Sequence, residues 1–398
     1  MKERTDSKIS KDYIHMKFAI FTLCIIFFIS CKNTHTEDNN YDMKTLTFKE
    51  SAGVLEDTIF FKSAIMLPLE TDSSALIGYI SRIYMADDTL FILDQNFQSV
   101  FVYDTKGKYI NSIQNVGAGP KEYIDLGDIC VDNINKELLV LCTRPSKVQF
   151  YSYHGELLRE KQLGDKYYSH IGMDGEYIYL HDDTGINKNK EIDIYNRQLN
   201  YIESALERGE SFKNNDASTI SHFCQGSTMT QGSSVLIARD FDNTIFEAKN
   251  GEIYPKYLLD FKEHTLPKKL LDGKMKSFDF LDYCRENKYI ISVKEFVESP
   301  KFLLFTTNLG VFVCDKQKQE MTRYSFLLNT ESGMGGSDFQ IIGNTNKLVT
   351  VESVGRIKQM LEDVLKYNPD AGKCNIDFRK KINAMDDEAN PILFIYDF

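Results

Sequence analysis

The chain has 398 residues, of which 42% are hydrophobic, and its formal net charge is −11. Residues 1–30 hold five Lys or Arg and three Asp or Glu, a net of +2, so residues 31–398 carry about −13. This acidic balance argues against a nucleic-acid partner, which needs a basic surface. Tyrosine (22) and phenylalanine (27) are abundant, and on short apolar runs they favour strands over helices.

The first recognisable segment is MKFAIFTLCIIFFISC, residues 16–31. Its apolar run, Phe18–Ile29, has twelve residues and is too short to span a bilayer as a helix. Residues 1–31 are therefore predicted to be a signal peptide. Ser30-Cys31 resembles a bacterial lipoprotein cleavage site, which predicts a cell-envelope protein held at the outer membrane by a lipid on Cys31. The alternative is an ordinary secretory signal in which Cys31 is incidental.

Residues 32–52 are predicted to be a flexible tether, since they begin with an Asn-, Thr- and Asp-rich stretch that is too polar to pack. Residues 53–398 are then the folded domain. The cysteines beyond the signal region are widely separated, with no CxxC pair and no histidine at metal-ligand spacing. They are predicted to be small core residues, and no zinc site, disulfide or cofactor is predicted.

A repeated pattern starts at residues 100–110, where an alternating strand ends in Tyr-Asp and a turn around Gly107 leads into a second strand. The copies are VFVYDTKGKYI (100–110), VQFYSYHGEL (148–157), IDIYNRQLNY (192–201), TIFEAKNGEI (244–253), VFVCDKQKQE (311–320) and LFIYDF (393–398). A strand, a turn and another strand precede each copy, so one unit has four strands and recurs every 44 to 52 residues early in the chain. This predicts an all-β fold, a six-bladed β-propeller. A β-sandwich is the alternative, but it does not explain the shared order of strands and turns.

Three departures from the repeat are consistent with a propeller. Residues 266–287 and 355–368 have helical periodicity, with a further possible helix over 377–386, and are predicted to be helical insertions that pack on the propeller. The last unit lacks a fourth strand, because the chain ends at residue 398. The apolar run at residues 57–70 has no unit of its own, so it is expected to supply that strand and close the ring.

The sequence LPLETDSSALIGYISRIYMADDTLFILD, followed by VFVYDTKGKYI, NVGAGPKEY and the terminal NPILFIYDF, resembles six-bladed β-propeller lipoproteins of Bacteroides-type bacteria, relatives of NHL-repeat proteins. The resemblance covers nearly the whole mature chain and is strongest over residues 76–123 and 390–398. It implies a propeller on the cell envelope and implies little about activity. The segment GAGPKEY lacks the phosphate-loop pattern, and is interpreted as a tight connection between blades.

In propellers, the loops between second and third strands and the loops between blades share one face around the central channel, where ligands usually bind. Polar residues and charged residues of both signs are expected there, which suits a polar or ionic ligand. The alternative is that these residues are polar only because loops generally are. Arg144 and Arg239 occupy equivalent loops and could bind a carboxylate or phosphate, unless Arg239 only pairs with Asp240. The candidate ligand-binding residues are Asp94, Asn96, Arg144, His170, His181, Arg239, Asp240, Asn308 and Arg356.

No catalytic residue is predicted, because neither a G-x-S-x-G elbow nor an HExxH motif is present. The leading hypothesis is a non-catalytic lipoprotein that binds a polar ligand or an envelope protein. Two alternatives stay open. One is a hydrolase or lyase with a metal bound in the channel, and the other is a docking subunit of an outer-membrane assembly.

Overall fold

The computed structural model describes residues 42–184, 186–187, 190–209, 229–232, 234–336, 338–367 and 376–398, and residues 43–398 form one unit. The predicted signal peptide, its Cys31 and the start of the predicted tether lie outside the described residues. Among the described helices, none combines the length and the hydrophobicity that crossing a membrane requires.

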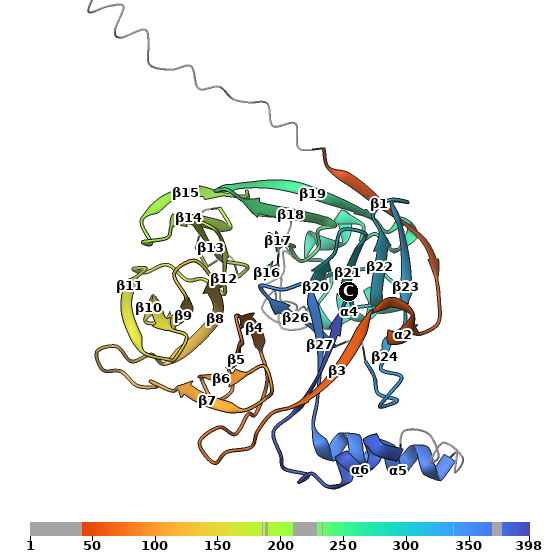
Figure 1. The fold of residues 1–398 in the computed structure, drawn as a ribbon. Coiled ribbons are helices and arrows are strands. Elements are labelled where there is room, and N and C mark those ends of the chain that lie inside the picture. The colour runs from red at the N-terminus through yellow and green to blue at the C-terminus, as the bar shows by residue number, and fades with distance from the viewer. Residues whose placement is uncertain are drawn as a thin grey trace, which may run out of the picture. The chain divides into compact units, whose positions relative to one another are not determined.

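Most strands belong to four-stranded antiparallel groups that are consecutive in sequence (Figure 1). The first group is β4 (Arg82–Ala86), β5 (Thr89–Asp94), β6 (Ser99–Asp104) and β7 (Tyr109–Ile113). The second is β8 (Asp125–Asp132), β9 (Glu137–Arg144), β10 (Ser146–Ser152) and β11 (Leu157–Gln162). The third is β12 (His170–Asp174), β13 (Tyr177–His181), β14 (Ile192–Asn196) and β15 (Tyr201–Ala205).

Later groups follow the same order, which makes the fold propeller-like. One is β16 (Met229–Gln231), β17 (Val235–Ile237), β18 (Thr244–Lys249) and β19 (Glu252–Asp260), and the next is β20 (Val293–Glu298), β21 (Phe302–Thr307), β22 (Gly310–Asp315) and β23 (Glu320–Tyr324). The last contains β26 (Gln340–Gly343), β27 (Lys347–Glu352) and β28 (Ile392–Asp397). The short strands β2 (Leu55–Glu56), β24 (Leu327–Leu328) and β25 (Gly335–Gly336) form a separate small sheet.

The repeated sequence occupies the third strand of each group, and all but the last copy continue through the turn into the fourth, as expected. In three of the groups an Asp or Asn side chain builds the turn locally. Asp104 Oδ1 accepts hydrogen bonds from the backbone N–H groups of Lys106 (2.9 Å) and Lys108 (2.8 Å). Asn196 and Asp315 hold their turns in the same way. Such side-chain-to-backbone bonds favour turns over continued strands.

The two ends of the folded region pair with each other. Strand β3 (Ser63–Pro68) runs antiparallel to β28, with Ser63 opposite Asp397 and Pro68 opposite Ile392. The expected pairing of segment 57–70 with the end of the chain is therefore present, although its first residues form the short helix α2 (Asp57–Phe60) instead. This pairing gives β28, whose side chains are mostly buried, a partner on both edges.

The tether ends earlier than the sequence analysis placed it. Strand β1 (Lys44–Ser51) lies between β19 and β23 and pairs with both in parallel, which joins two groups into one nine-stranded sheet. Leu46 is fully buried there, and Phe48 packs beside it. Without β1 the outer strands β19 and β23 would each present an unpaired edge, which explains why so polar a segment is ordered.

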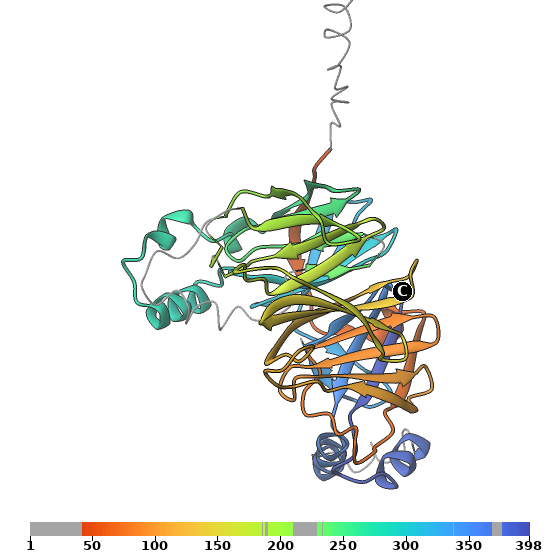
Figure 2. The same ribbon diagram turned by 90° about the vertical axis from the view of Figure 1, so that its left-hand side faces the viewer.

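Helices occupy both expected insertions. The first insertion contains the 3-10 helices η1 (Lys262–His264) and η2 (Lys268–Asp272) and the helix α4 (Ser277–Glu286). The continuous periodicity of residues 266–287 is interrupted, because Gly273 adopts a left-handed φ of 77° and ends η2. The second contains α5 (Val354–Tyr367) and α6 (Ile376–Asn383). Figure 2 shows these two insertions beyond different edges of the strands.

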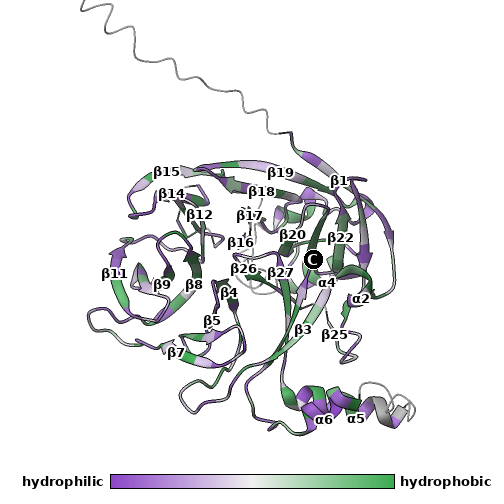
Figure 3. Cartoon of the chain, in the orientation of Figure 1, coloured by the Kyte–Doolittle hydropathy of each residue, from purple (hydrophilic) through white to green (hydrophobic). Residues whose placement is uncertain are grey.

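The second insertion packs through the apolar stripe that the sequence indicated, whereas α4 of the first insertion buries Phe280 and Cys284 and leaves Phe278 61% exposed. Ile357 and Leu361 of α5 are buried with Phe378 and Ile382 of α6 and with Phe394 of β28. Figure 3 shows that both hydrophobic and hydrophilic residues occur along these helices. The stripes therefore serve packing, since an amphipathic helix buries its apolar face against the body of the protein.

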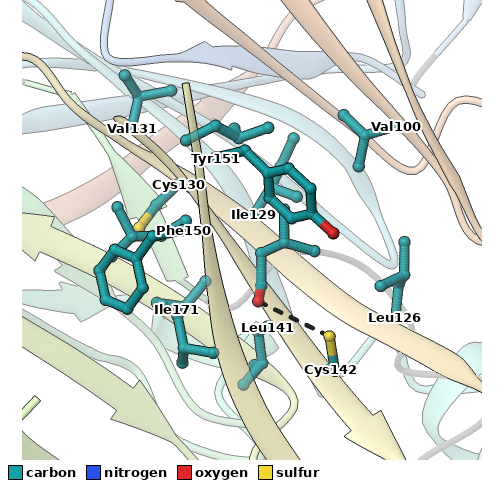
Figure 4. Packing of buried hydrophobic residues seen from close by; sticks show 14 of the residues in the cluster. Val100, Leu126, Ile129, Cys130, Val131, Leu141, Cys142, Phe150, Tyr151 and Ile171 are labelled. Carbon is teal, nitrogen blue, oxygen red and sulfur yellow. Dashed lines mark hydrogen bonds between the residues drawn. The ribbon is translucent and has the colours of Figure 1, made fainter. Parts of the chain in front are cut away.

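The strands of neighbouring groups bury large apolar clusters between them. In the cluster drawn in Figure 4, Cys142 lies near Tyr151 and Leu126, and Cys130 lies beside Phe150. Cys130, Cys142, Cys284 and Cys314 are buried and unpaired, and burial raises the pKa of the Cys142 thiol to about 12. These four behave as small core residues, while Cys224 and Cys374 lie outside the described residues.

Candidate functional site

A cavity of about 1160 Å³ is lined by residues from every four-stranded group. The first strands of the groups surround the middle of the ribbon in Figure 1. Several of them contribute wall residues, among them Arg82 of β4, Asp128 of β8, His170 of β12, Lys294 of β20 and Gln340 of β26. A cavity of this size can enclose most of a small-molecule ligand.

The connections between second and third strands complete the lining. They contribute Gln95, Asp183, Asp240, Asn308 and Arg356, and Thr143 lines the cavity from the end of β9. This is the set of loops that the sequence analysis assigned to a common face. Because the groups share one strand order, equivalent loops reach the same opening.

A chain of charged side chains runs along one wall. The Arg82 guanidinium donates to Asp128 from Nε (3.0 Å) and Nη2 (3.2 Å), and Nη2 also donates to the Met229 carbonyl oxygen (2.7 Å). His170 Nδ1 lies 3.6 Å from Asp128 Oδ2, and its Nε2 lies 3.1 Å from Asp183 Oδ2. The imidazole is thus placed between two carboxylates.

This arrangement shifts the pKa values along the chain. Burial disfavours the charged imidazolium, but Asp183 and Asp128 outweigh burial and raise the pKa of His170 to about 9. Burial likewise disfavours the ionised Asp128, yet Arg82 and His170 hold the pKa of that carboxyl below its ordinary value. At neutral pH the wall therefore carries two cations and two anions in alternation.

The whole lining is richer in acids than in bases. The carboxylate residues are Asp125, Asp128, Asp183, Asp240, Glu295, Asp338 and Glu352, and the cations are Arg82, Lys294, Arg356 and protonated His170. The lining thus has a surplus of three carboxyl groups. A lining with a net negative charge raises the local concentration of cationic solutes.

Glu352, at the end of β27, contributes a buried carboxyl with an unsatisfied oxygen. The residue is 8% exposed, and Oε2 accepts no hydrogen bond from any described residue. The nearest cation is Arg356, whose Nε lies 3.6 Å from Oε2, beyond hydrogen-bonding distance. Burial raises the pKa of Glu352, Arg356 opposes the shift, and Asp338 adds to it.

Four of the predicted ligand-binding residues line the cavity, and these are His170, Asp240, Asn308 and Arg356. Asp94 does not line it, because its carboxylate is buried and accepts hydrogen bonds from the backbone N–H groups of Gly78 (2.7 Å) and Tyr79 (3.1 Å). The N–H of Asn96 donates to the same carboxylate at 2.9 Å. Asp94 and Asn96 therefore shape a loop beside the cavity.

The remaining predicted residues have other contacts. Arg144 forms an ion pair with Asp125, and its side chain is 67% exposed. Arg239 pairs with Asp242, not with the neighbouring Asp240 that the sequence suggested, and its guanidinium lies 4.7 Å from the centre of the Phe246 ring. The structure therefore does not bring the two arginines together in the lining.

His181 is the last predicted residue, and it is 1% exposed. Neither of its ring nitrogens has a hydrogen-bond partner among the described residues. Glu191 Oε2 is 3.9 Å from its Nε2, and the His170 ring centre is 5.8 Å away. Across the described part of the chain, no group of three His, Cys, Asp or Glu side chains is arranged to hold a metal ion.

Several residues of the lining were not predicted from the sequence, most notably Arg82, Asp128, Glu295 and Asp338. Arg82 and Asp128 lie within apolar strands, in the segments SRIYMA and LGDICVD. A charged residue inside an apolar strand is costly unless it is paired, so such residues are signals of a special environment. That signal was present in the sequence. It does not indicate whether the charged side chain faces a cavity or a neighbouring sheet.

The fold is similar to that of a Bacteroides fragilis protein described as exported. The two share 19% identity, the match covers 89% of this chain and 99% of that one, and the TM-score is 0.70. The RRP9 WD40 repeats (12% identity, 72% of this chain and 76% of that one, TM-score 0.43) and a streptogramin B lyase (11%, 72% and 80%, 0.40) are more distant. These two likenesses are too weak to carry an argument.

No curated protein matches the sequence. The family described as "Domain of unknown function (DUF4934)" matches residues 40–397, which is most of the chain and nearly all of its described part. The chain therefore belongs to this family.

Proposed function

We propose that this protein is a six-bladed, NHL-like β-propeller lipoprotein of the cell envelope that binds a polar ligand in its central cavity without transforming it. The signal-like segment ending at Cys31 and the exported relative from Bacteroides fragilis support an extracytoplasmic location. The repeated four-stranded groups and the pairing of β3 with β28 support a closed ring. A lipid on Cys31 would hold the folded unit at the outer membrane.

The cavity is the observation that carries the binding function. It holds about 1160 Å³, each four-stranded group contributes to its lining, and charged side chains of both signs face it. Ligand sites in proteins are concave and place a few polar groups on a rigid frame. Here the Arg82–Asp128–His170–Asp183 chain is fixed by its own hydrogen bonds and ion pairs, so the wall is formed before any ligand arrives.

A charge-reversal variant tests this function. Asp338 is exposed and lines the cavity, so Asp338→Arg should place a long cationic side chain there without disturbing the core. Asp165→Arg is the matched control, because Asp165 is exposed and does not line the cavity. Thermal shift should be measured with neutral sugars, amino sugars, uronic acids, amino acids and polyamines.

We expect at least one of these compounds to raise the Tm of the parent protein in a saturable manner. Asp338→Arg should change that shift, whereas Asp165→Arg should preserve it. Equal shifts in all three proteins would place the ligand outside the cavity, and the absence of any shift across the panel would contradict the binding function.

A further inference from the structure

We propose that the ligand of this cavity is an organic amine, with an ammonium or guanidinium group bound beside Glu352 and Asp338. This inference rests on the proposed binding function and names the chemical class that the cavity selects. Three features of the lining carry it: an unsatisfied buried acceptor, cations that are already engaged by the protein, and an exposed aromatic ring on the cavity lining.

The unsatisfied acceptor is Glu352 Oε2. The residue is 8% exposed and lines the cavity, but no described residue donates a hydrogen bond to this oxygen. A buried polar atom without a partner is unfavourable, and such atoms in native proteins usually have a partner in a bound molecule or water. Gln340 Oε1, also in the lining, has no partner among the described residues either. Both atoms are acceptors, so a molecule that reaches them must donate a hydrogen bond.

The cations of the lining are largely engaged by the protein itself. Arg82 is bound to Asp128 and to the Met229 carbonyl oxygen. His170 is held between Asp128 and Asp183. An anionic ligand would have to displace these contacts and enter a lining with a surplus of carboxyl groups. A cation does not compete for these carboxylate contacts of Arg82 and His170, and the surplus of carboxyl groups attracts it.

Asp338 offers the complementary charge. It is exposed, lines the cavity and forms no hydrogen bond or ion pair with another described residue. It is also close enough to Glu352 to raise the pKa of that carboxyl further, after burial has raised it. A cation bound near both side chains would favour the ionised form of Glu352.

Tyr79 supplies an aromatic surface on the same lining. Its side chain is on the cavity lining, and the residue is 57% exposed. Burial raises the pKa of Tyr79, and the fields of Asp338 and Glu295, which line the same cavity, raise it further. Asp94 accepts a 3.1 Å hydrogen bond from the Tyr79 backbone N–H, which fixes the backbone from which the ring projects, and an organic cation can contact the face of such a ring.

Three sugars of similar size separate the possible classes. D-Glucosamine carries an ammonium group, D-glucose is neutral and D-glucuronate is an anion, and spermidine serves as a flexible polyamine. In titration calorimetry at low salt we expect glucosamine and spermidine to bind, with glucose and glucuronate weaker by about tenfold or more, which corresponds to about 1.4 kcal/mol. Added salt should weaken amine binding, because salt screens the attraction.

Variants of Glu352, Asp338 and Tyr79 test which side chains bind the amine. Glu352→Gln keeps the shape of the side chain but removes its charge, and should weaken amine binding by about tenfold. Asp338→Asn should weaken it as well, and Tyr79→Leu should do so without changing any charge. Asp165→Asn, at an exposed position off the cavity, is the control and should leave the affinity unchanged.

Several results would overturn the assignment. Tighter binding of glucuronate than of glucosamine would do so, as would unchanged amine affinity in Glu352→Gln and Asp338→Asn, or no binding of either amine at millimolar concentration. If glucose or glucuronate binds instead, and Asp338→Arg alters that binding, the cavity is still the ligand site. Only the assignment of the ligand as an amine would then be rejected. The two proposals therefore fail in different ways.

Discussion

Replacing His170 with glutamine should destabilise the protein at pH 6 and much less at pH 10. The pKa of His170 is raised to about 9, against an ordinary value of 6.5. A pKa difference of one between the folded and unfolded states corresponds to about 1.36 kcal/mol, so the charged imidazole contributes up to about 3 kcal/mol of stability. This is an upper value, since the Asp183 side chain is 35% exposed and solvent screens the pair.

The sign of the pH dependence follows from the raised value. A histidine whose pKa is higher in the folded state stabilises that state fully below its unfolded pKa of about 6.5. The contribution is lost as the pH rises through about 9. The difference in unfolding free energy between parent and His170→Gln should therefore be largest at pH 6 and shrink towards pH 10.

Urea unfolding of both proteins at pH 6, 8 and 10 measures this difference directly. His154→Gln is the matched control, because His154 is exposed on a turn and its loss should leave the stability nearly unchanged. If His170→Gln is equally destabilised at all three pH values, the effect comes from lost packing. The charge chain through Asp128 and Asp183 would then not be the source of the stability.

Three further predictions concern the stability of the folded domain and the lipid anchor on Cys31. Gly107→Ala should lower the unfolding free energy by more than about 1 kcal/mol, because the new Cβ would lie 2.2 Å from the Pro68 carbonyl oxygen at a φ of +81°. Gly53→Ala, with no atom within 4 Å of its new Cβ, should not, and equal urea midpoints would refute the clash. Deleting residues 390–398 removes β28 and leaves β3 and β27 without their shared partner, so limited proteolysis should degrade the variant rapidly; resistance equal to the parent would contradict this. Cys31→Ala should move the protein from the membrane fraction to the soluble one, and retention after a high-salt wash would reject the lipid anchor.

The strand repeat could be predicted from sequence, because its determinants are local. Short apolar runs such as that of β6 mark strands that are buried on both faces, and a side chain such as Asp104 closes its own turn with bonds to residues two and four positions away. The stripe on α5 is local in the same sense, since it requires only the helical period. The pairing of β3 with β28 could also be predicted. The last repeat unit lacked a fourth strand, and the apolar run at residues 57–70 belonged to no unit.

Strand β1 could not be predicted, because its reason for being ordered lies elsewhere in the chain. Its sequence, KTLTFKES, has only Leu46 and Phe48 as large apolar residues. The segment is held by the edges of β19 and β23, which belong to residues more than 200 positions away. Whether those two edges are open and correctly spaced is a property of the assembled fold.

In the candidate site, too, some features follow from local sequence and others only from the assembled fold. The sequence by itself determined the groups of strands and the loops that share a face, because these depend on periodicity and turn residues. His170 and His181 were both predicted on that face, and they are paired directly across β12 and β13. Only His170 lines the cavity, whereas His181 is 1% exposed. The tertiary structure decided this, because the distance of a strand from the central axis determines whether its side chains meet the cavity or the neighbouring sheet.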